Sequence, residues 1–364
     1  MKILFIINLG HGYSATLPER NMFRGLQARG VDLTVLTHWK TIESLELESS
    51  GIKVVYIPII RKFDIPAIYK IRKLIKAENY EIIHITYGKA ITNLLIASCF
   101  LKVKFVAFLG SLSLHWHDPF TYFSFLSRRI DKLICLSDAV QAHVLKQAPA
   151  RMKNKTVRIY KGYDPDWLKY VVSADRKKLN IPVDSLVICC VANIRKIKGV
   201  EFLIEAADYL PDDLPVWFIL VGNKTDSRVI MKMIRKTKYC DNFITIGYSD
   251  EPLVYTSICD LYIQPSVSEG LGRSVIEAMC LGKPVVVTDK GGAKELVNEG
   301  INGYVVPVKS AKALAEKITE CYENRHNLHI MGEKARERIL NDFNPQIAID
   351  RTYNLYADLL GEKL

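Results

Sequence analysis

The chain has 364 residues, of which 49% are hydrophobic and 24% are charged, and its formal net charge is +11. This length allows two domains with separate cores, and the composition is ordinary for a soluble globular enzyme and excludes a low-complexity protein. The basic charge favours an anionic partner, and nucleic acid ranks last because the chain has no zinc-finger spacing, arginine-rich arm or aromatic RNA-binding motif.

In chain order, the first half alternates short apolar runs with amphipathic segments. Continuous apolar runs are typical of buried parallel strands, and their alternation with helical patterns predicts a βαβ sheet. The predicted strands are residues 3–9, 32–37, 53–59, 81–86, 104–110 and 132–137.

A break follows around Tyr160 to Asp175, which is rich in turn formers. A second α/β series comes after it, so we expect two Rossmann-like domains that face each other across a cleft, over residues 1–164 and 165–344. The last helical pattern, residues 345–364, is expected to pack back on the first domain. The predicted strands of the second series are residues 186–192, 216–222, 243–248, 261–266, 283–289 and 303–308.

The cysteines and the N-terminus indicate a cytoplasmic protein. None of the eight cysteines forms a C-x-x-C pair and most lie in apolar runs, which favours free thiols in a reducing compartment. The first apolar run is too short for a signal peptide and is better interpreted as a buried strand. The longest apolar stretch, Ile91 to Leu101, is followed by Lys102 and Lys104, so we expect no segment to span a bilayer.

The stretch from Pro265 to Val297 is the most informative about function. Glu269 and Glu277 stand eight positions apart across a glycine-rich turn that opens a helix, and a further strand ends at Gly291-Gly292. A strand, a tight turn and a helix N-terminus together form a site for the phosphates of a nucleotide. Two added carboxylates suggest that hydroxyl-rich sugars lie beside those phosphates.

This stretch resembles the E-x7-E motif of retaining glycosyltransferases with the GT-B fold, specifically glycosyltransferase family 4. The ordered series of motifs carries the resemblance, since two glutamates eight apart are common by chance. The series is ANIRKIKGVEFLIEAA at residues 192–207, Pro265-Ser266, EGLGRSVIE at residues 269–277, Gly282-Lys283-Pro284-Val285-Val286 and Gly291-Gly292.

The resemblance implies separate roles for the two carboxylates, with Glu277 on the nucleotide ribose and Glu269 on the hydroxyls of the donor sugar. A glutamate in the first turn of a helix can also merely complement the helix dipole. Glu277 lies in an apolar run, however, where an unpaired carboxylate is costly, so a hydroxyl partner explains it better. The other predicted donor-binding residues are Gly270, Leu271, Gly272, Arg273, Asn193, Gly222, Gly247 and Tyr248.

Lys198 is the predicted cation for the leaving diphosphate, on which negative charge builds in the transition state. It precedes Gly199 at a strand-to-helix junction, as the family's diphosphate lysine does. Asn193 stands where the family usually has an arginine, and Arg195 is the candidate to replace it. A solvated basic loop is the alternative for Arg195. Arg273 could meet a donor phosphate or an acidic sugar, or could cover apolar neighbours with its stem.

A rival signal lies near the N-terminus, where Gly10, Gly12 and Ala15 fit the G-x-G-x-x-A pattern of a dinucleotide site. Pro18 is expected to break the helix that should follow, and the next strand ends without an acidic ribose ligand. Relatives also have a glycine turn here, against which donor and acceptor pack. We favour that role for Gly10 and Gly12.

Histidines near the predicted acceptor side have several interpretations. Gly110 occupies the position where the family often has a catalytic-site histidine, and His115 and His117 lie just beyond it. Their H-x-H spacing could suggest a metal, but no third ligand is evident, so we predict no metal site. A flexible acceptor loop is the alternative. His84 is expected to line the cleft at a strand end rather than to act as a base.

The segment from Arg61 to Lys76 is basic and has an apolar face formed by Ile68, Ile71, Leu74 and Ile75. Such a helix is either solvated on its charged side or lies on an anionic membrane. The second interpretation would place the protein at the inner face of the cytoplasmic membrane.

The resulting prediction is a retaining, metal-independent glycosyltransferase without a cofactor. It would move a sugar from a nucleotide-diphosphate sugar to a saccharide or lipid-linked acceptor in cell-envelope, polysaccharide or glycolipid assembly. The departing phosphate oxygen would take the acceptor proton, and domain closure near Tyr163 would exclude water. The alternatives are a nucleotide-sugar epimerase, a dinucleotide-dependent oxidoreductase, and a non-catalytic basic protein that docks on membranes or polyanions.

Overall fold

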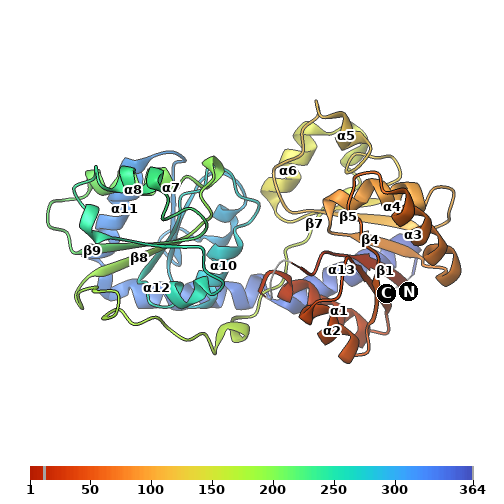
Figure 1. Ribbon diagram of the computed structural model, residues 1–364, viewed down its shortest axis with the longest axis horizontal. Coiled ribbons are helices and arrows are strands. Elements are labelled where there is room, and N and C mark those ends of the chain that lie inside the picture. The colour runs from red at the N-terminus through yellow and green to blue at the C-terminus, as the bar shows by residue number, and fades with distance from the viewer. Residues whose placement is uncertain (11–13, 363–364) are drawn as a thin grey trace. The chain divides into compact units, whose positions relative to one another are not determined.

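The computed structural model describes residues 1–10 and 14–362, which form two α/β units (Figure 1). Unit 1 comprises residues 1–162 and 343–364, and unit 2 comprises residues 163–342. The chain therefore leaves unit 1 after Gly162 and returns to it at Phe343. Each unit contains one parallel sheet.

The sheet of unit 1 has the strand order β3-β2-β1-β4-β5-β6-β7, and all its pairings are parallel. The six strands predicted in this region are confirmed, whereas β7 was not predicted because its three residues form no apolar run. The order reverses between β1 and β4, and the carboxyl ends of these two strands mark the usual ligand crevice of such a sheet. The strands are β1 (Lys2–Ile6), β2 (Asp32–Thr37), β3 (Lys53–Tyr56), β4 (Ile82–Ile85), β5 (Lys104–Leu109), β6 (Lys132–Cys135) and β7 (Thr156–Arg158).

Helices of unit 1 cover both faces of this sheet, and the last helix of the chain, α13, lies beside α1 (Figure 1). A Cβ added to Gly25 of α1 would lie 2.3 Å from Cδ1 of Ile349 in α13, so glycine permits the close approach. The helices are α1 (Leu17–Ala28), α2 (Ile42–Ser49), α3 (Ile65–Glu78), α4 (Ile91–Ala97), α5 (Pro119–Tyr122), α6 (Asp138–Gln147) and α13 (Pro345–Leu360).

Two sequence-based expectations for these helices are wrong. Pro18 does not break a helix but lies in the first turn of α1, where its missing N–H costs nothing. The apolar face of α3 is not free for a membrane, because Ile71 and Ile75 are buried and Ile68 and Leu74 pack against the same core. The core of unit 1 uses this face because α3 must cover an apolar sheet.

The sheet of unit 2 has the order β10-β9-β8-β11-β12-β13, again wholly parallel. All six strands predicted here are confirmed, and the order reverses between β8 and β11. The strands are β8 (Leu186–Val191), β9 (Val216–Val221), β10 (Phe243–Gly247), β11 (Leu261–Gln264), β12 (Val285–Thr288) and β13 (Gly303–Val306). The helices are α7 (Val200–Ala206), α8 (Arg228–Ile234), α9 (Pro252–Thr256), α10 (Arg273–Cys280), α11 (Ala311–Glu323) and α12 (Leu328–Asp342).

Short 3-10 helices join many of these elements. The 3-10 helices are η1 (Ser14–Thr16), η2 (Gly88–Ala90), η3 (Ala150–Met152), η4 (Pro165–Leu168), η5 (Lys196–Lys198), η6 (Ala207–Tyr209), η7 (Cys240–Asn242), η8 (Ala293–Leu296) and η9 (Arg325–Asn327).

Two further predictions concern the whole chain. All eight cysteines are free thiols. Within residues 1–10 and 14–362, no helix has the length and apolar character needed to cross a membrane.

Candidate active site

Lys198 and Glu269 meet at the point where the strand order of unit 2 reverses. Lys198 ends η5 in the loop after β8, and Glu269 lies in the loop after the neighbouring strand β11. The Nζ of Lys198 is 2.6 Å from Oε2 of Glu269, and the two side chains are only 18% and 15% exposed. Partial burial strengthens this ion pair relative to one in open solvent.

The two loops that carry this pair are joined through their backbones. The carbonyl oxygen of Ile197 accepts hydrogen bonds from the N–H groups of Val267 (2.9 Å) and Ser268 (3.2 Å). Gly199 has a φ of +63°, and a Cβ at this position would lie 2.1 Å from the carbonyl oxygen of Pro265. Both the left-handed conformation and the close approach require glycine here.

A buried chain of hydrogen bonds orients the Glu269 carboxylate. The hydroxyl of Ser266 donates to Oε2 of Glu269 (3.2 Å), and Nε2 of Gln264 donates to the Ser266 hydroxyl (3.0 Å). The hydroxyls of Tyr262 and Ser274 each donate to Oε1 of Gln264 at 2.9 Å. A buried and satisfied network of this kind fixes the positions of its members.

The motif series includes Pro265-Ser266, but it does not predict the hydrogen bonds that Gln264 and Ser266 form. The available signal was the polar pair Gln264 and Ser266 at the end of the apolar strand β11. Both side chains are fully buried, at 0% and 1% exposure. Buried polar side chains at a strand end need partners, and here the partners lead to Glu269.

The glycine turn at Gly291-Gly292 supports Glu269 from the other side. The N–H of Gly292 donates to the carbonyl oxygen of Glu269 (3.0 Å). Gly291 has a φ of +83°, and a Cβ there would lie 2.2 Å from the same oxygen. The turn therefore lies directly against the backbone of Glu269.

Helix α10 begins immediately after the turn of Gly270, Leu271 and Gly272. Gly272 occupies the N-cap with a φ of +91°, and no side chain caps the helix. The first N–H groups of a helix have no partner within the helix, and they carry partial positive charge. An uncapped N-terminus beside Lys198 and Glu269 suits a phosphate group.

Glu277 lies in α10 and is 8% exposed. Burial raises the pKa of its carboxyl to about 7, and the nearby Arg273 guanidinium opposes this rise. Nε of Arg273 is 3.6 Å from Oε1 of Glu277, and the Arg273 side chain is 49% exposed. Burial of the charged Glu277 carboxylate therefore costs free energy in the ligand-free protein, and a ligand that donates hydrogen bonds to it would reduce this cost.

The remaining predicted donor-binding residues form the carboxyl edge of strands β8, β9 and β10. Oδ1 of Asn193 accepts a hydrogen bond from the N–H of Asn223 (2.8 Å), which ties the loops after β8 and β9 together. A Cβ on Gly222 would lie 2.4 Å from the carbonyl oxygen of Ala192. Asn193 therefore has a structural role at this edge, and Arg195 lies exposed on the same loop.

Gly247 and Tyr248 extend this edge at the end of β10. The N–H of Gly247 donates to the Thr225 hydroxyl (3.0 Å), and its carbonyl oxygen accepts from the N–H of Gly222 (2.8 Å). Tyr248 is 71% exposed, and its hydroxyl donates to Oδ1 of Asp250 (2.6 Å). Its exposed ring is available to a planar ligand group.

The predicted residues of the N-terminal half lie in unit 1. Gly10 follows β1, where its N–H donates to Oδ1 of Asn8 (3.0 Å), and Gly110 follows β5. Gly12 lies outside the described residues. The exposed rings of His115 and His117 stack at 5.3 Å.

His143, which sequence reasoning missed, lies beside this histidine pair. Its ring is 5.9 Å from that of His115, and its Nε2 donates to the carbonyl oxygen of Leu114 (2.7 Å). In the part of the chain that the structure describes, no group of three or more His, Cys, Asp or Glu side chains could hold a metal ion.

His84 lies next to the last residue of β4, close to its expected place at a strand end, but it is buried. It lies within β4, and burial lowers the pKa of its imidazole to about 3. Its Nδ1 is 2.5 Å from the hydroxyl of Tyr356 in α13. The sequence could not reveal this burial, because the covering helix α13 is distant in the chain.

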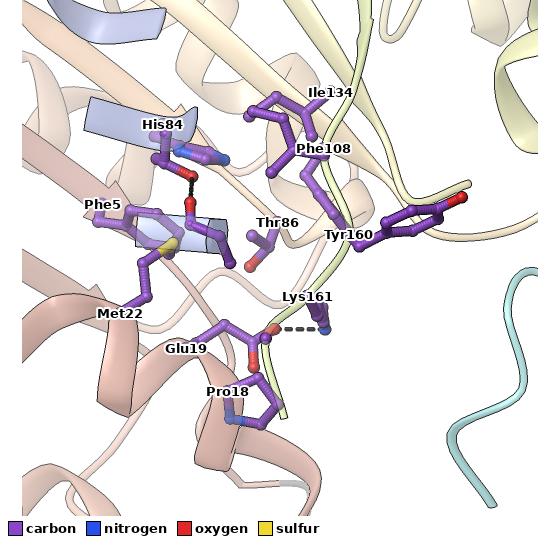
Figure 2. A pocket seen from close by; sticks show the side chains of 14 residues that line it. Phe5, Pro18, Glu19, Met22, His84, Thr86, Phe108, Ile134, Tyr160 and Lys161 are labelled. Carbon is purple, nitrogen blue, oxygen red and sulfur yellow. Dashed lines mark hydrogen bonds and ion pairs between the residues drawn. The ribbon is translucent and has the colours of Figure 1, made fainter. Parts of the chain in front are cut away.

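His84 also lines a small cavity inside unit 1, between the sheet and helices α1 and α13 (Figure 2). The cavity has a volume of about 40 Å³. Phe5 and Phe108 line it from the sheet, and the carboxylate of Glu19 pairs with Nζ of Lys161 at its rim (Figure 2). This volume suits a few waters and is too small for a nucleotide sugar.

Comparison with known proteins gives matches over both units. The family model described as "Glycosyl transferases group 1" matches residues 171–338, and the one described as "Glycosyltransferase Family 4" matches residues 20–167. The candidate residues Lys198, Glu269 and Glu277 all lie within the first match.

Individual relatives are distant. N-acetyl-alpha-D-glucosaminyl L-malate synthase of Bacillus anthracis is 24% identical over 187 residues, which cover 51% of this chain and 49% of that protein. The O-antigen biosynthesis glycosyltransferase WclY of Escherichia coli is 28% identical over 235 residues, which cover 64% of this chain and 63% of that protein. The chain thus spans about half of the first relative and 63% of the second.

A solved structure matches the whole fold. HepE from Anabaena in complex with UDP superimposes with a TM-score of 0.80 at 23% identity, covering 98% of this chain and 100% of that one. Two parallel α/β units, together with family models that match both, establish the family. The chain belongs to the GT-B-fold glycosyltransferases of the family 4 type.

Proposed function

We propose that this protein transfers a sugar from a nucleoside-diphosphate sugar to an acceptor hydroxyl, with retention of anomeric configuration and without a metal ion. The ion pair of Lys198 and Glu269 is the observation that carries this proposal. It lies at the carboxyl edge of a Rossmann-like sheet, in the loops of the two strands where the order reverses. A cation for phosphate and a carboxylate for hydroxyls therefore stand together.

Each group has a role that fits its surroundings. Lys198 and the uncapped N–H groups at the start of α10 would bind the diphosphate. Glu277 would accept hydrogen bonds from the ribose hydroxyls, which offers its buried carboxylate the polar partners it needs. Glu269, oriented by Ser266, would accept hydrogen bonds from the hydroxyls of the sugar.

Catalysis follows from where charge develops. As the bond between the sugar and the diphosphate breaks, negative charge grows on the leaving oxygen, and Lys198 with the helix amides stabilises it. That oxygen takes the proton of the acceptor hydroxyl, and the acceptor oxygen bonds to the anomeric carbon on the face that the diphosphate leaves, so the configuration is retained. This route requires no protein base, and the buried His84 is not proposed as one.

The relatives suggest where to look for substrates. HepE was crystallised with UDP, and WclY is named for O-antigen biosynthesis. We therefore propose a uridine diphosphate sugar as the first donor to test and a saccharide or lipid-linked saccharide as acceptor. The pathway class would be the assembly of cell-envelope polysaccharide or glycolipid.

The test is the release of nucleoside diphosphate from a panel of uridine, guanosine and adenosine diphosphate sugars, with and without acceptor saccharides. We expect Glu269→Gln to lower turnover by about 100-fold or more at an unchanged melting temperature. Glu316→Gln, an exposed carboxylate on α11, is the matched control and should leave turnover unaltered. EDTA should also leave turnover unaltered.

Three results would overturn the proposal. Conversion of a nucleotide sugar to its epimer without acceptor would indicate an epimerase. Turnover that depends on a nicotinamide dinucleotide would indicate an oxidoreductase. Full activity of Glu269→Gln would remove the site from the reaction.

A further inference from the structure

The ion pair of Lys198 and Glu269 joins two groups that would bind different parts of the donor. Lys198 would bind the diphosphate, and Glu269 would bind the hydroxyls of the sugar. In the ligand-free protein, however, Nζ of Lys198 lies 2.6 Å from Oε2 of Glu269. The width of a sugar ring separates the hydroxyls opposite the anomeric carbon from the phosphate. One ammonium group at this distance from Glu269 therefore does not serve both parts of the donor.

Each member of the pair depends on the other while the site holds no ligand. Both side chains are largely buried, at 18% and 15% exposure. Within residues 1–10 and 14–362, Glu269 is the only acidic side chain that pairs with Lys198. A partly buried charge that loses its partner costs free energy. The pair is therefore stable until a ligand offers a new partner to one or both of its members.

Glu269 is the fixed member of the pair. The hydroxyl of Ser266 donates to its Oε2 (3.2 Å), and the N–H of Gly292 donates to its carbonyl oxygen (3.0 Å). A Cβ on Gly291 would lie 2.2 Å from that carbonyl oxygen and 2.8 Å from the backbone nitrogen of Glu269. Side chain and backbone are thus held from two directions, so Glu269 keeps its position when a ligand binds.

Lys198 is the movable member. Its backbone is anchored, because its N–H donates to the carbonyl oxygen of Arg195 (2.8 Å) and the next residue, Gly199, has a φ of +63°. Its ammonium group stands on a flexible four-carbon stem. Among the described residues, the hydrogen bond to Glu269 is the only one that its side chain makes. Rotation of this stem alone can move the ammonium group from Glu269 to a phosphate.

We propose that Glu269 and the bound diphosphate compete for Lys198, and that this competition promotes release of the nucleoside diphosphate product. The competition rests on the proposed function, which assigns the diphosphate to Lys198 and the sugar to Glu269. The intact donor satisfies both members, because its phosphates pair with Lys198 while its sugar hydroxyls donate to Glu269. The product has no sugar, so Glu269 draws Lys198 back.

This competition gives the two parts of the reaction opposite requirements for Glu269. The carboxylate supports turnover, because it orients the sugar. The same carboxylate weakens the hold on the product, because it withdraws a cation from the diphosphate. Release of product limits turnover in many enzymes, so such a withdrawal has a functional use. A carboxylate that only supports the shape of the site would instead strengthen the binding of donor and product alike.

The test is calorimetric titration of uridine, guanosine and adenosine diphosphates into the wild type and Glu269→Gln. The glutamine oxygen still accepts a hydrogen bond from Lys198, but it carries no charge and competes less. We expect Glu269→Gln to bind the diphosphate that the wild type binds about 5- to 10-fold more tightly. Stopped-flow displacement should show this gain as slower dissociation. The melting temperature shows that the variant is folded.

Glu201→Gln is the charge-matched control. Glu201 lies three positions after Lys198, in the first turn of α7. In the described part of the chain its side chain pairs with no cation, so its removal takes away a nearby negative charge without releasing Lys198. Water and salt screen a charge that makes no direct contact. Glu201→Gln should therefore bind the diphosphate like the wild type.

A crystal structure with the bound diphosphate gives a second measurement. It should show Nζ of Lys198 on phosphate oxygens and outside ion-pair distance of Glu269, while Glu269 keeps its hydrogen bond from Ser266. An ammonium group that stays on Glu269 in this complex would overturn the competition. Equal or weaker binding by Glu269→Gln, or equal tightening by Glu201→Gln, would overturn it as well and leave the proposed function standing. If the wild type binds none of the three diphosphates, both are overturned.

Discussion

At the scale of single residues, the two glutamates of the E-x7-E motif have different surroundings, and these surroundings separate their roles. Glu269 is held by Lys198 at 2.6 Å and by Ser266 at 3.2 Å, so its carboxylate is fixed in position. Glu277 is buried, and its pKa is raised to about 7. The sequence could predict which residues matter, because the motif spacing is specific. It could not predict Gln264 and Ser266 as supports, because their role depends on contacts within the folded loop.

Glu277 predicts a pH dependence of stability in the ligand-free protein. Its folded pKa of about 7 lies above its ordinary value of 4.5, so the folded state binds the proton more tightly. Stability should therefore fall as pH rises from about 4.5 to about 7, by about 1 kcal/mol for each pH unit in this window, and then level off. Glu277→Gln should be more stable than the wild type at about pH 8 and should lose this advantage at about pH 5.

Melting curves at both pH values check this prediction, and Glu316→Gln serves as the control at an exposed site. The same Glu277→Gln variant should bind the donor nucleotide more weakly, since the amide is a poorer partner for ribose hydroxyls. If the difference in stability between the wild type and Glu277→Gln is the same at both pH values, the raised pKa of Glu277 is contradicted.

At the scale of elements, the site depends on glycine turns that allow backbone to touch backbone. Gly199 lies against the carbonyl oxygen of Pro265, and Gly291 lies against that of Glu269. A Cβ at either glycine would clash with that oxygen. The strands were predictable because buried parallel strands leave long apolar runs. The start of α1 at Leu17 and the burial of the apolar face of α3 were not, because both depend on what packs against the helix.

Gly291→Ala tests the contact with Glu269, and Gly300→Ala is its matched control. The two glycines have similar φ values of +83° and +71°, but an added Cβ would meet nothing within 4 Å at Gly300. Both variants should lose about 1–2 kcal/mol from the left-handed conformation. Only Gly291→Ala should also displace Glu269 and lower turnover, by about tenfold or more. Equal turnover in the two variants would show that the turn does not position Glu269.

At the scale of the whole molecule, the basic residues lie in both units. In unit 2, Lys198 lies at the proposed diphosphate site. In unit 1, the exposed Lys73 and Lys76 line a shallow hollow on α3. Composition alone indicated an anionic partner, but it could not say which cations would meet it. The structure assigns one of them, Lys198, to the site at the carboxyl edge of the second sheet.

The central claim is that a nucleoside diphosphate binds at the edge of unit 2 through Lys198. Calorimetric titration with uridine, guanosine and adenosine diphosphates tests it most directly. The wild type should bind one of the three at one site, Lys198→Gln should bind it about 10- to 100-fold more weakly, and Lys177→Gln should bind it like the wild type. No binding to any of the three, or equal binding by Lys198→Gln, would contradict the claim.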